Sequence, residues 1–305
     1  MAARPLLAPP SSAAAASPTL AWASPTLAWG SQGLARTFEE TPRGASSFTF
    51  DAAGRAVVVD ELGHRVVVLD ESGKPARAVA LPHPHADEVL VSRGGQLVVL
   101  DRRDTGTVSV ERADGGWSTI QLSGAGVDEP RAVSRLVEHE GGLYVQRDGN
   151  GPLLKVGDTS GRAAAEPAEL QGIPTRDGRF LVSAGVTDAE RGRVWVNLAR
   201  AADATHVWTR ELRLPVEVGA VGLVDTDDHG RVYVVSLGET REGVYSNWLT
   251  CLAQADGKAI STQSFPVQPR WESFRDFEVR PSGGLVVAMR EPDGLRFVTV
   301  SCDGQ

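Results

Sequence analysis

The sequence predicts an all-β chain that folds into one six-bladed β-propeller of four-stranded antiparallel blades. The first observation is a repeated pattern, Gly-x-[Ala/Val/Leu]-x-Val, which opens at Gly54, Gly95, Gly141, Gly192, Gly230 and Gly283. These glycines lie on average about 46 residues apart, the length typical of one propeller blade. The second is that 33 glycines and 18 prolines indicate many turns. The third is the Val57-Val58-Val59 run, which predicts a strand that is buried on both faces.

The first blade illustrates the pattern. We expect four strands, named A to D from the inside of the ring outwards, over residues 48–51, 55–60, 65–70 and 74–81. Short turns separate them, with glycine where a positive φ is needed. A blade lies between two neighbours, and this demands a continuous apolar run such as the three valines of strand B.

The later blades repeat this plan over residues 87–122, 133–170, 179–214, 220–266 and 274–305. The fourth blade admits two registers, one with Gly178 and one with Gly192 as the turn glycine between strands A and B. We prefer Gly192, because residues 193–196 (Arg-Val-Trp-Val) match the other copies of the pattern.

The last blade has three strands, over residues 277–279, 285–289 and 296–301, and lacks a fourth. An unpaired edge would leave the ring prone to aggregation. We therefore expect residues 34–40 to supply the missing strand and to join the two ends of the chain.

The N-terminal region before this strand is rich in Ala, Pro and Ser and contains a tandem heptad, residues 16–22 followed by 23–29. Regular prolines and little apolar surface predict disorder for residues 1–33, with residues 34–305 as a single domain. The duplication is interpreted either as a bivalent linear motif that presents Trp22 and Trp29 or as a neutral duplication in a tolerant tail.

Composition limits partner and compartment. A net charge of −8 without any Lys/Arg-rich run argues against nucleic acid as a partner. No apolar stretch is long enough to span a membrane, and residues 1–30 lack the apolar run of a secretory signal, so we expect a cytoplasmic protein unless the start is misassigned. Cys251 and Cys302 fall in strands of different blades and are expected to be unpaired thiols.

Residues 48–73, with Asp-x-x-Gly-Arg and Val-Val-Asp-Glu-Leu-Gly-His-Arg-Val-Val-Val-Leu, resemble one repeat of the NHL-type β-propellers. A more distant similarity is to the regucalcin and gluconolactonase propellers. The resemblance implies a six-bladed ring that presents a ligand or partner surface at one end of its channel.

The B–C turns and D–A connections of such a ring share one rim, which we name the top rim. We expect a non-enzymatic scaffold that binds a protein partner or a small ligand there, because Arg and aromatic side chains dominate binding energetics. The candidate contacts are Arg131, Arg147, Arg270, Trp271, Phe274 and Arg275. The alternative is that Trp271 and Phe274 pack inwards between the last two blades.

The enzymatic alternative is a calcium-dependent hydrolase of the lactonase type. The sequence has no Gly-x-Ser-x-Gly, phosphate-loop or His-Glu-x-x-His signature. Glu88 and Asp276 lie equally far before their turn glycines, so we expect both at the channel mouth, where they are candidate contacts for a partner or ligand. In the lactonase alternative they are ligands for calcium, and otherwise they are solvated carboxylates. Ser47, Ser134 and Val221 fill corresponding places in other blades, so a complete oxygen cage is not evident.

A zinc site is a further candidate, formed by His83, His85 and Asp87 with His64 from the neighbouring turn. Residues two apart in an extended segment point to the same side, about 6.6 Å apart, so their side chains could converge on one ion. Pro82 and Pro84 favour polyproline II geometry, which rotates the two histidines apart. The alternative is a stiff loop with exposed histidines.

Overall fold

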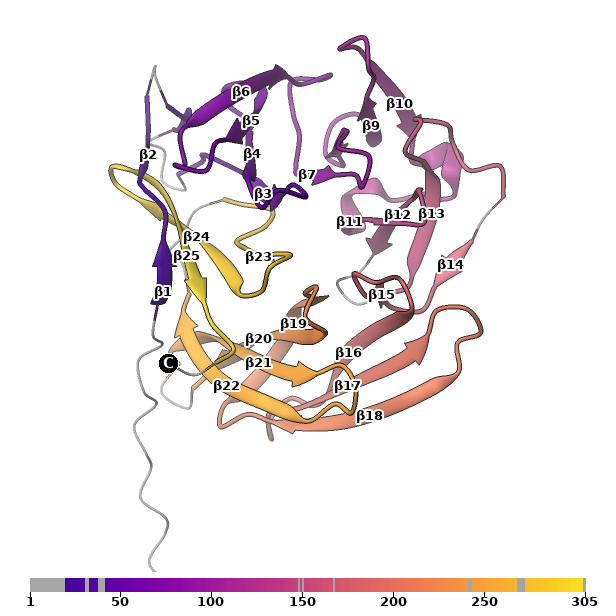
Figure 1. The fold of residues 1–305 in the computed structure, drawn as a ribbon, viewed down its shortest axis with the longest axis vertical. Coiled ribbons are helices and arrows are strands. Elements are labelled where there is room, and N and C mark those ends of the chain that lie inside the picture. Colours follow the sequence, from indigo (N-terminus) through magenta and orange to yellow (C-terminus); the bar gives the residue numbers. More distant parts are fainter. Residues whose placement is uncertain are drawn as a thin grey trace, which may run out of the picture.

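A computed structural model describes residues 20–30, 33–37, 42–147, 149, 151–166, 168–240, 243–267 and 272–303. It confirms the all-β, six-bladed propeller: six antiparallel sheets surround a central axis, with β3, β7, β11, β15, β19 and β23 innermost (Figure 1).

The blades follow one another along the chain. Blade 1 contains β3 (Ser47–Phe50), β4 (Ala56–Asp60), β5 (Arg65–Leu69) and β6 (Pro75–Ala80). Blade 2 contains β7 (Glu88–Val91), β8 (Leu97–Asp101), β9 (Thr107–Glu111) and β10 (Trp117–Gln121). Two short 3-10 helices, η1 (Ser123–Ala125) and η2 (Pro130–Ala132), lead to blade 3, with β11 (Val133–His139), β12 (Gly142–Arg147), β13 (Leu153–Asp158) and β14 (Glu169–Leu170).

The second half of the ring has longer strands. Blade 4 contains β15 (Ile173–Pro174), β16 (Phe180–Asp188), β17 (Arg193–Arg200) and β18 (His206–Arg213). Blade 5 contains β19 (Glu217–Thr226), β20 (Arg231–Glu239), β21 (Tyr245–Ala253) and β22 (Ala259–Pro266). Blade 6 contains β23 (Phe277–Val279), β24 (Leu285–Glu291) and β25 (Gly294–Val300), together with β1 (Leu20–Ala23) and β2 (Leu27–Ala28).

The register preferred for blade 4 is wrong. Gly178, with φ of 72°, is its turn glycine between strands A and B, because β15 pairs with β16 across residues 175–179. Gly192 also has a positive φ, but it lies in the turn between β16 and β17. The Arg-Val-Trp-Val copy of the pattern therefore begins strand C, not strand B. The spacing of the glycines did not reveal this, because β16, β17 and β18 are long and carry a second turn glycine.

Hydrophobic clusters fill the spaces between neighbouring blades. Val57 and Val59 pack towards blade 2, whereas Val58 packs towards blade 6. This arrangement confirms that strand B of blade 1 is buried on both faces.

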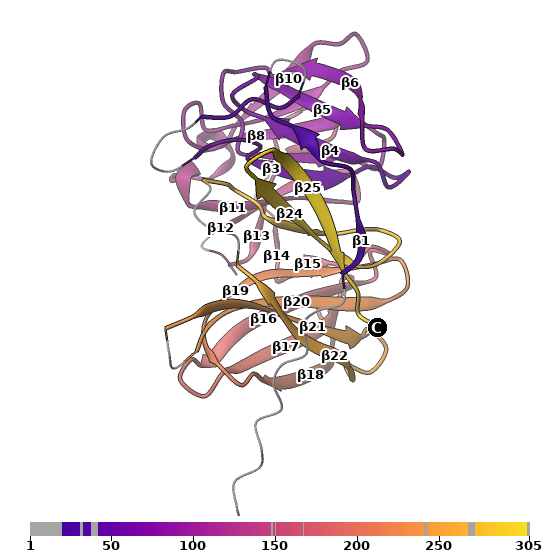
Figure 2. The same cartoon turned by 90° about the vertical axis from the view of Figure 1, so that its left-hand side faces the viewer.

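The strand that pairs with the edge of β25 comes from the N-terminal region, and the described part of the expected segment, residues 34–37, does not supply it. Strand β1 lies beside β25 (Figure 2). Leu20 pairs with Val300 and Leu27 with Leu295, both in antiparallel register. Leu34 is buried and forms only a bridge to Trp29, and residues 38–40 lie outside the described residues. The expectation of disorder is therefore wrong for residues 20–30, because both copies of the Leu-Ala pair satisfy backbone groups of β25.

The expectation of two unpaired thiols is also wrong. Cys251 in β21 and Cys302, just after β25, form a disulfide that joins blade 5 to the C-terminal end of blade 6. Each cysteine lies in a separate blade, so the sequence pattern alone did not bring them together. Both sulfurs belong to the hydrophobic cluster between these two blades.

No helix in the described part of the chain has the length and apolar character needed to span a membrane.

Candidate binding site

A network of buried charges crosses the centre of the ring. Arg275, just before β23, contacts the carboxylates of Glu88 and Glu278, the latter at 2.6 Å. Arg135 in β11 donates to Asp225 and to the carbonyl of Val224, both at 2.5 Å. Each residue comes from, or directly precedes, an innermost strand, so four blades contribute to this network. Buried charges of this kind are stable only when they are paired.

Glu88 is the residue whose protonation is most affected. Burial raises its pKa to about 7, although Arg275 and Arg135 oppose the shift. Its second oxygen accepts a hydrogen bond from the backbone N–H of Leu136 at 2.7 Å. The carboxyl group therefore changes its charge near neutral pH inside a closed network.

A cavity of about 540 Å³ lies on one side of this network, at the top-rim end of the channel. Its polar lining includes Ser134, Gln146 and Ser183, and its aromatic lining includes Trp195, Phe274 and Phe277. Asp276 also lines it, but this carboxylate accepts hydrogen bonds from Ser273 at 2.6 Å and from Arg290 at 2.5 Å. The cavity has the size of a small-ligand site, with apolar walls and few polar groups.

A second cavity of about 310 Å³ lies on the other side of the network, towards the A–B turns. Arg135 and Arg275 line both cavities, so the ion network separates them. The second cavity is mainly polar, with Asp51, Arg93 and Glu138 in its wall.

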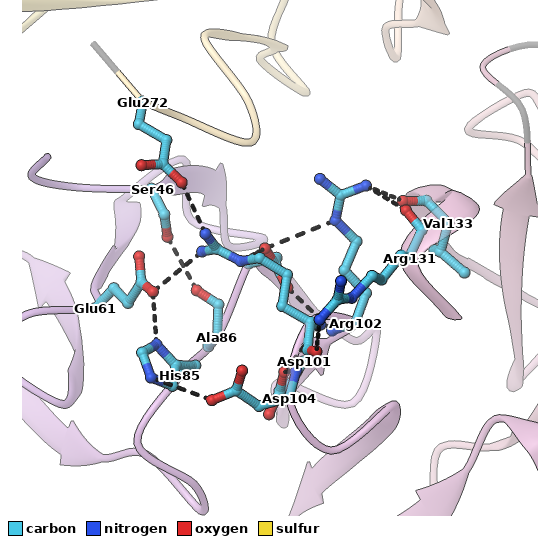
Figure 3. Close-up of polar contacts among 12 residues, drawn as sticks. Ser46, Glu61, His85, Ala86, Asp101, Arg102, Asp104, Arg131, Val133 and Glu272 are labelled. Atoms are coloured by element: carbon cyan, nitrogen blue, oxygen red, sulfur yellow. Dashed lines mark hydrogen bonds and ion pairs between the residues drawn. The ribbon is translucent and has the colours of Figure 1, made fainter. Parts of the chain in front are cut away.

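A surface cluster of charges covers the top rim above blades 1 and 2 (Figure 3). Arg103 is its centre: it contacts Asp87 at 2.7 Å, Glu61 at 3.0 Å and Glu272 at 2.8 Å. Although burial opposes the effect, these three carboxylates raise the pKa of Arg103 above its ordinary value. Arg102, beside it, donates to the carbonyls of Arg131 and Val133 and lies 4.7 Å from the centre of the Phe274 ring. We name Arg43, Glu61, His85, Asp87, Arg102, Arg103, Asp104 and Glu272 the rim charge cluster.

The structure does not assemble the four residues proposed for zinc. His85 is held between Glu61, 2.8 Å from Nδ1, and Asp104, 3.2 Å from Nε2. The Nδ1 of His64 bonds to the carbonyl of Pro84, which confirms that this turn approaches the proline-rich connection. Asp87 is buried against Arg102 and Arg103, and burial raises its pKa. Across the described residues, no group of three or more His, Cys, Asp or Glu side chains is arranged to hold a metal ion.

His83 is separate from these contacts, since its Nε2 is buried without a hydrogen-bond partner. The two histidines of the connection therefore have different surroundings.

The proposed calcium ligands occupy equivalent backbone positions, as expected: Glu88 pairs with Leu100, and the carbonyl of Asp276 accepts a hydrogen bond from the N–H of Ala288. Their carboxylates, however, are paired with different arginines, Glu88 with Arg275 and Asp276 with Arg290. This geometry neutralises both side chains within the protein.

The proposed rim contacts have different surroundings. Arg131 is exposed at η2, and Phe274 is half-buried at the cavity. Arg275 points inwards to the ion network. Arg147 ends β12 on the top rim, with its Nε buried and lacking a hydrogen-bond partner among the described residues. Arg270 and Trp271 lie outside the described residues.

Sequence reasoning missed Arg135 and Trp195. Arg135 lies in the predicted innermost strand of blade 3, β11 (Val133–His139), and a charge at such a position was a usable signal. Trp195 was assigned to strand B because the register of blade 4 was wrong, so its position at the channel mouth could not be inferred.

Comparisons with known proteins agree on the fold. No protein-family model matches the chain, and no curated protein matches it. A member of the DUF4221 family from Bacteroides vulgatus is 11% identical, with a TM-score of 0.58; the match covers 92% of this chain and 97% of that chain. Hydrazine synthase from Kuenenia stuttgartiensis is 16% identical, with a TM-score of 0.54 and coverage of 81% and 74%. At these identities the likeness supports the propeller fold and carries no function.

Proposed function

We propose that the protein is a non-enzymatic binding scaffold that holds a small ligand or a protein partner at the top-rim end of its channel. The observation that carries this proposal is the 540 Å³ cavity. Its charged lining residues among those described, Arg135, Arg275 and Asp276, are all paired within the protein. A cavity with neutralised charges is suited to holding a molecule, whereas general base or metal chemistry needs an available carboxylate or imidazole.

The rim charge cluster supports a second contact beside the cavity. Asp104 and Glu272 are about half exposed, at 55% and 48%, and Arg131 is exposed next to them. Phe274 joins the two regions, because it lines the cavity and lies under Arg102. A partner that contacts Arg131 would thus cover the cavity mouth as well. We retain Arg270 and Trp271 as proposed contacts of the same surface.

The test is native mass spectrometry of the purified protein, which detects a bound small molecule or partner. The variant Ser134→Leu adds apolar volume to this cavity, and Ala52→Leu adds it to the opposite cavity as a matched control. We expect the bound species to be lost in Ser134→Leu and kept in Ala52→Leu. Loss in both variants, or in neither, would contradict binding at the top-rim end.

The lactonase alternative predicts turnover of lactones or phosphoesters in the presence of calcium. Turnover that disappears in Glu88→Ala would overturn the scaffold proposal. We expect no such turnover, because the Glu88 carboxyl group is buried against Arg275.

The remaining proposals concern family and compartment. The NHL-type repeat in blade 1 supports membership of that propeller class. The Cys251–Cys302 disulfide favours an oxidising compartment over the cytoplasm, since such bonds persist where thiols are not kept reduced. Labelling of thiols in freshly lysed cells tests this: two reactive cysteines would indicate a reducing compartment.

A further inference from the structure

We propose that the cavity binds an uncharged, planar ring compound whose hydrogen-bond acceptor is met by the indole N–H of Trp195 and the hydroxyl of Ser183. This inference rests on the proposed function and names the class of ligand. It follows from the shape of blade 4, from the position of Trp195 and from the charges around the cavity.

Blade 4 has one buried face and one incompletely covered face. Val194, Val196 and Leu198 of β17 are buried, whereas the alternate residues Trp195 and Asn197 are only half-buried. Trp208, on the buried face, donates to the carbonyl of Gln254 in blade 5. The other face therefore lies towards blade 3, whose outermost strand β14 has only two residues.

Trp195 and Ser183 share this incompletely covered face. Trp195 pairs with Gly185, and Ser183 lies two residues from Gly185 on the same strand, so both side chains point to one side about 7 Å apart. Both residues line the cavity.

Gly185 leaves room for the indole ring of Trp195 because it has no side chain. A Cβ atom there would lie 2.7 Å from Nε1 of Trp195, closer than real Cβ contacts, and 3.0 Å from Cε2, so the indole would have to shift. The ring therefore lies directly against the backbone of Gly185. Within the described residues, neither the indole N–H nor the Ser183 hydroxyl has a hydrogen-bond partner in the protein. Two polar groups thus remain for a ligand.

The surrounding charges select against a charged ligand. Arg135, Arg275 and Asp276 each have an internal partner, so an anion or a cation entering the cavity would lose its hydration without gaining an unpaired counter-charge. Phe274 and Phe277 add aromatic walls, which favour a flat ring. An ester, amide or lactone carbonyl is the kind of acceptor that the indole N–H and the hydroxyl can bond.

The test uses methyl 2-naphthoate as the neutral probe and 2-naphthoate as its anionic counterpart, with binding to the full chain followed by calorimetry and by saturation-transfer NMR. We expect the ester to bind at least about 10-fold more tightly than the carboxylate, because the carboxylate would be buried without a partner. Trp195→Phe should weaken binding of the ester by about 5- to 10-fold and Ser183→Ala by about 3-fold, the loss of a neutral hydrogen bond.

Two further variants control for structural effects. Trp117→Phe removes a half-buried tryptophan of blade 2 that bonds to Ala80, far from this face, and should leave ester binding unchanged. Gly185→Ala keeps both polar groups but displaces the indole, and should weaken binding as much as Trp195→Phe.

Absence of ester binding, equal binding of ester and carboxylate, or equal effects of Trp195→Phe and Trp117→Phe would each overturn the ligand class. None of these results would remove the scaffold function, which is tested separately by the natural bound species in Ser134→Leu and Ala52→Leu and by turnover in Glu88→Ala.

Discussion

Blade 1 and blade 4 occupy equivalent places in the ring but bury their strands differently. In blade 1, Val57 and Val58 are adjacent residues that are both fully buried, one towards each neighbouring blade. In blade 4, Val196 is fully buried and its neighbour Asn197 is half-buried. A strand with Val-Val-Val has two dry faces, whereas a strand with Val-Trp-Val-Asn has one.

This difference shows which blade can contribute a face to a binding site while the ring of blades stays closed. Strand β4 of blade 1 is packed against a neighbouring blade on both faces. Blade 4 is held mainly through blade 5, and its other face contributes Ser183 and Trp195 to the cavity. The alternation of apolar and polar residues thus marks the blade that is available for binding.

The largest expected effect comes from a charge placed in these strands. Val58→Asp and Val59→Asp should each destabilise the fold by more than about 4 kcal/mol, because either residue would bury an unpaired carboxylate. In blade 4, Val196→Asp should do the same, whereas Asn197→Asp should change the free energy of unfolding by less than about 1 kcal/mol. Denaturant unfolding of the four variants tests this; a severe effect of Asn197→Asp would show that both faces of blade 4 are closed.

Blade 6 differs from blades 1 and 4, because its outer strand comes from the N-terminal end of the chain. Removing residues 1–19 should leave the melting temperature nearly unchanged, since β1 and β2 remain. Removing residues 1–30 should lower it by about 10 °C or more, because the edge of β25 and the buried Phe297 lose their cover. Equal melting temperatures would mean that β1 and β2 do not stabilise the ring.

The disulfide fixes the other side of blade 6. Cys251→Ser with Cys302→Ser should lower the free energy of unfolding by about 2–4 kcal/mol, since the bond joins residues 51 apart in sequence. Denaturant unfolding of the wild type with and without a reducing agent, compared with the double variant, measures this. If the double variant is as stable as the oxidised wild type, the disulfide does not stabilise the fold.

The ion network makes stability depend on pH in a defined direction. The folded-state pKa of Glu88, about 7, lies above its ordinary value of 4.5, so the folded protein binds more protons between these values. Its contribution is full below about pH 4.5 and is lost as pH rises to about 7, a change on the order of 2–3 kcal/mol. The difference in unfolding free energy between wild type and Glu88→Gln should therefore fall over this range. A difference that is constant with pH would contradict the raised pKa.

Local pattern predicted most of the fold. The glycine repeat located five of the six A–B turns, and the valine run predicted the two buried faces of blade 1. The glycine repeat failed at blade 4. Gly192 has the same sequence pattern and a positive φ, but it precedes strand C instead of strand B.

The features that were not predicted depend on distant parts of the chain. Residues 20–28 lie in a region rich in Ala, Pro and Ser, and they form strands because β25, about 270 residues away in sequence, offers an edge. The Cys251–Cys302 bond likewise depends on how blades 5 and 6 meet. The pairing of Glu88 with Arg275 could not be read from either segment alone, so carboxylates that seemed available for calcium are neutralised in the folded chain.

Cysteine labelling tests the contrast between the two blades most directly. The two native cysteines form the disulfide, so N-ethylmaleimide reacts in the folded protein only with an introduced thiol. We predict that Ser183→Cys is labelled rapidly and that its neighbour Ala184→Cys is protected, whereas Val58→Cys and Val59→Cys in blade 1 are both protected. Protection of Ser183→Cys equal to that of Ala184→Cys would contradict an accessible face on blade 4 and, with it, the binding site at the channel mouth.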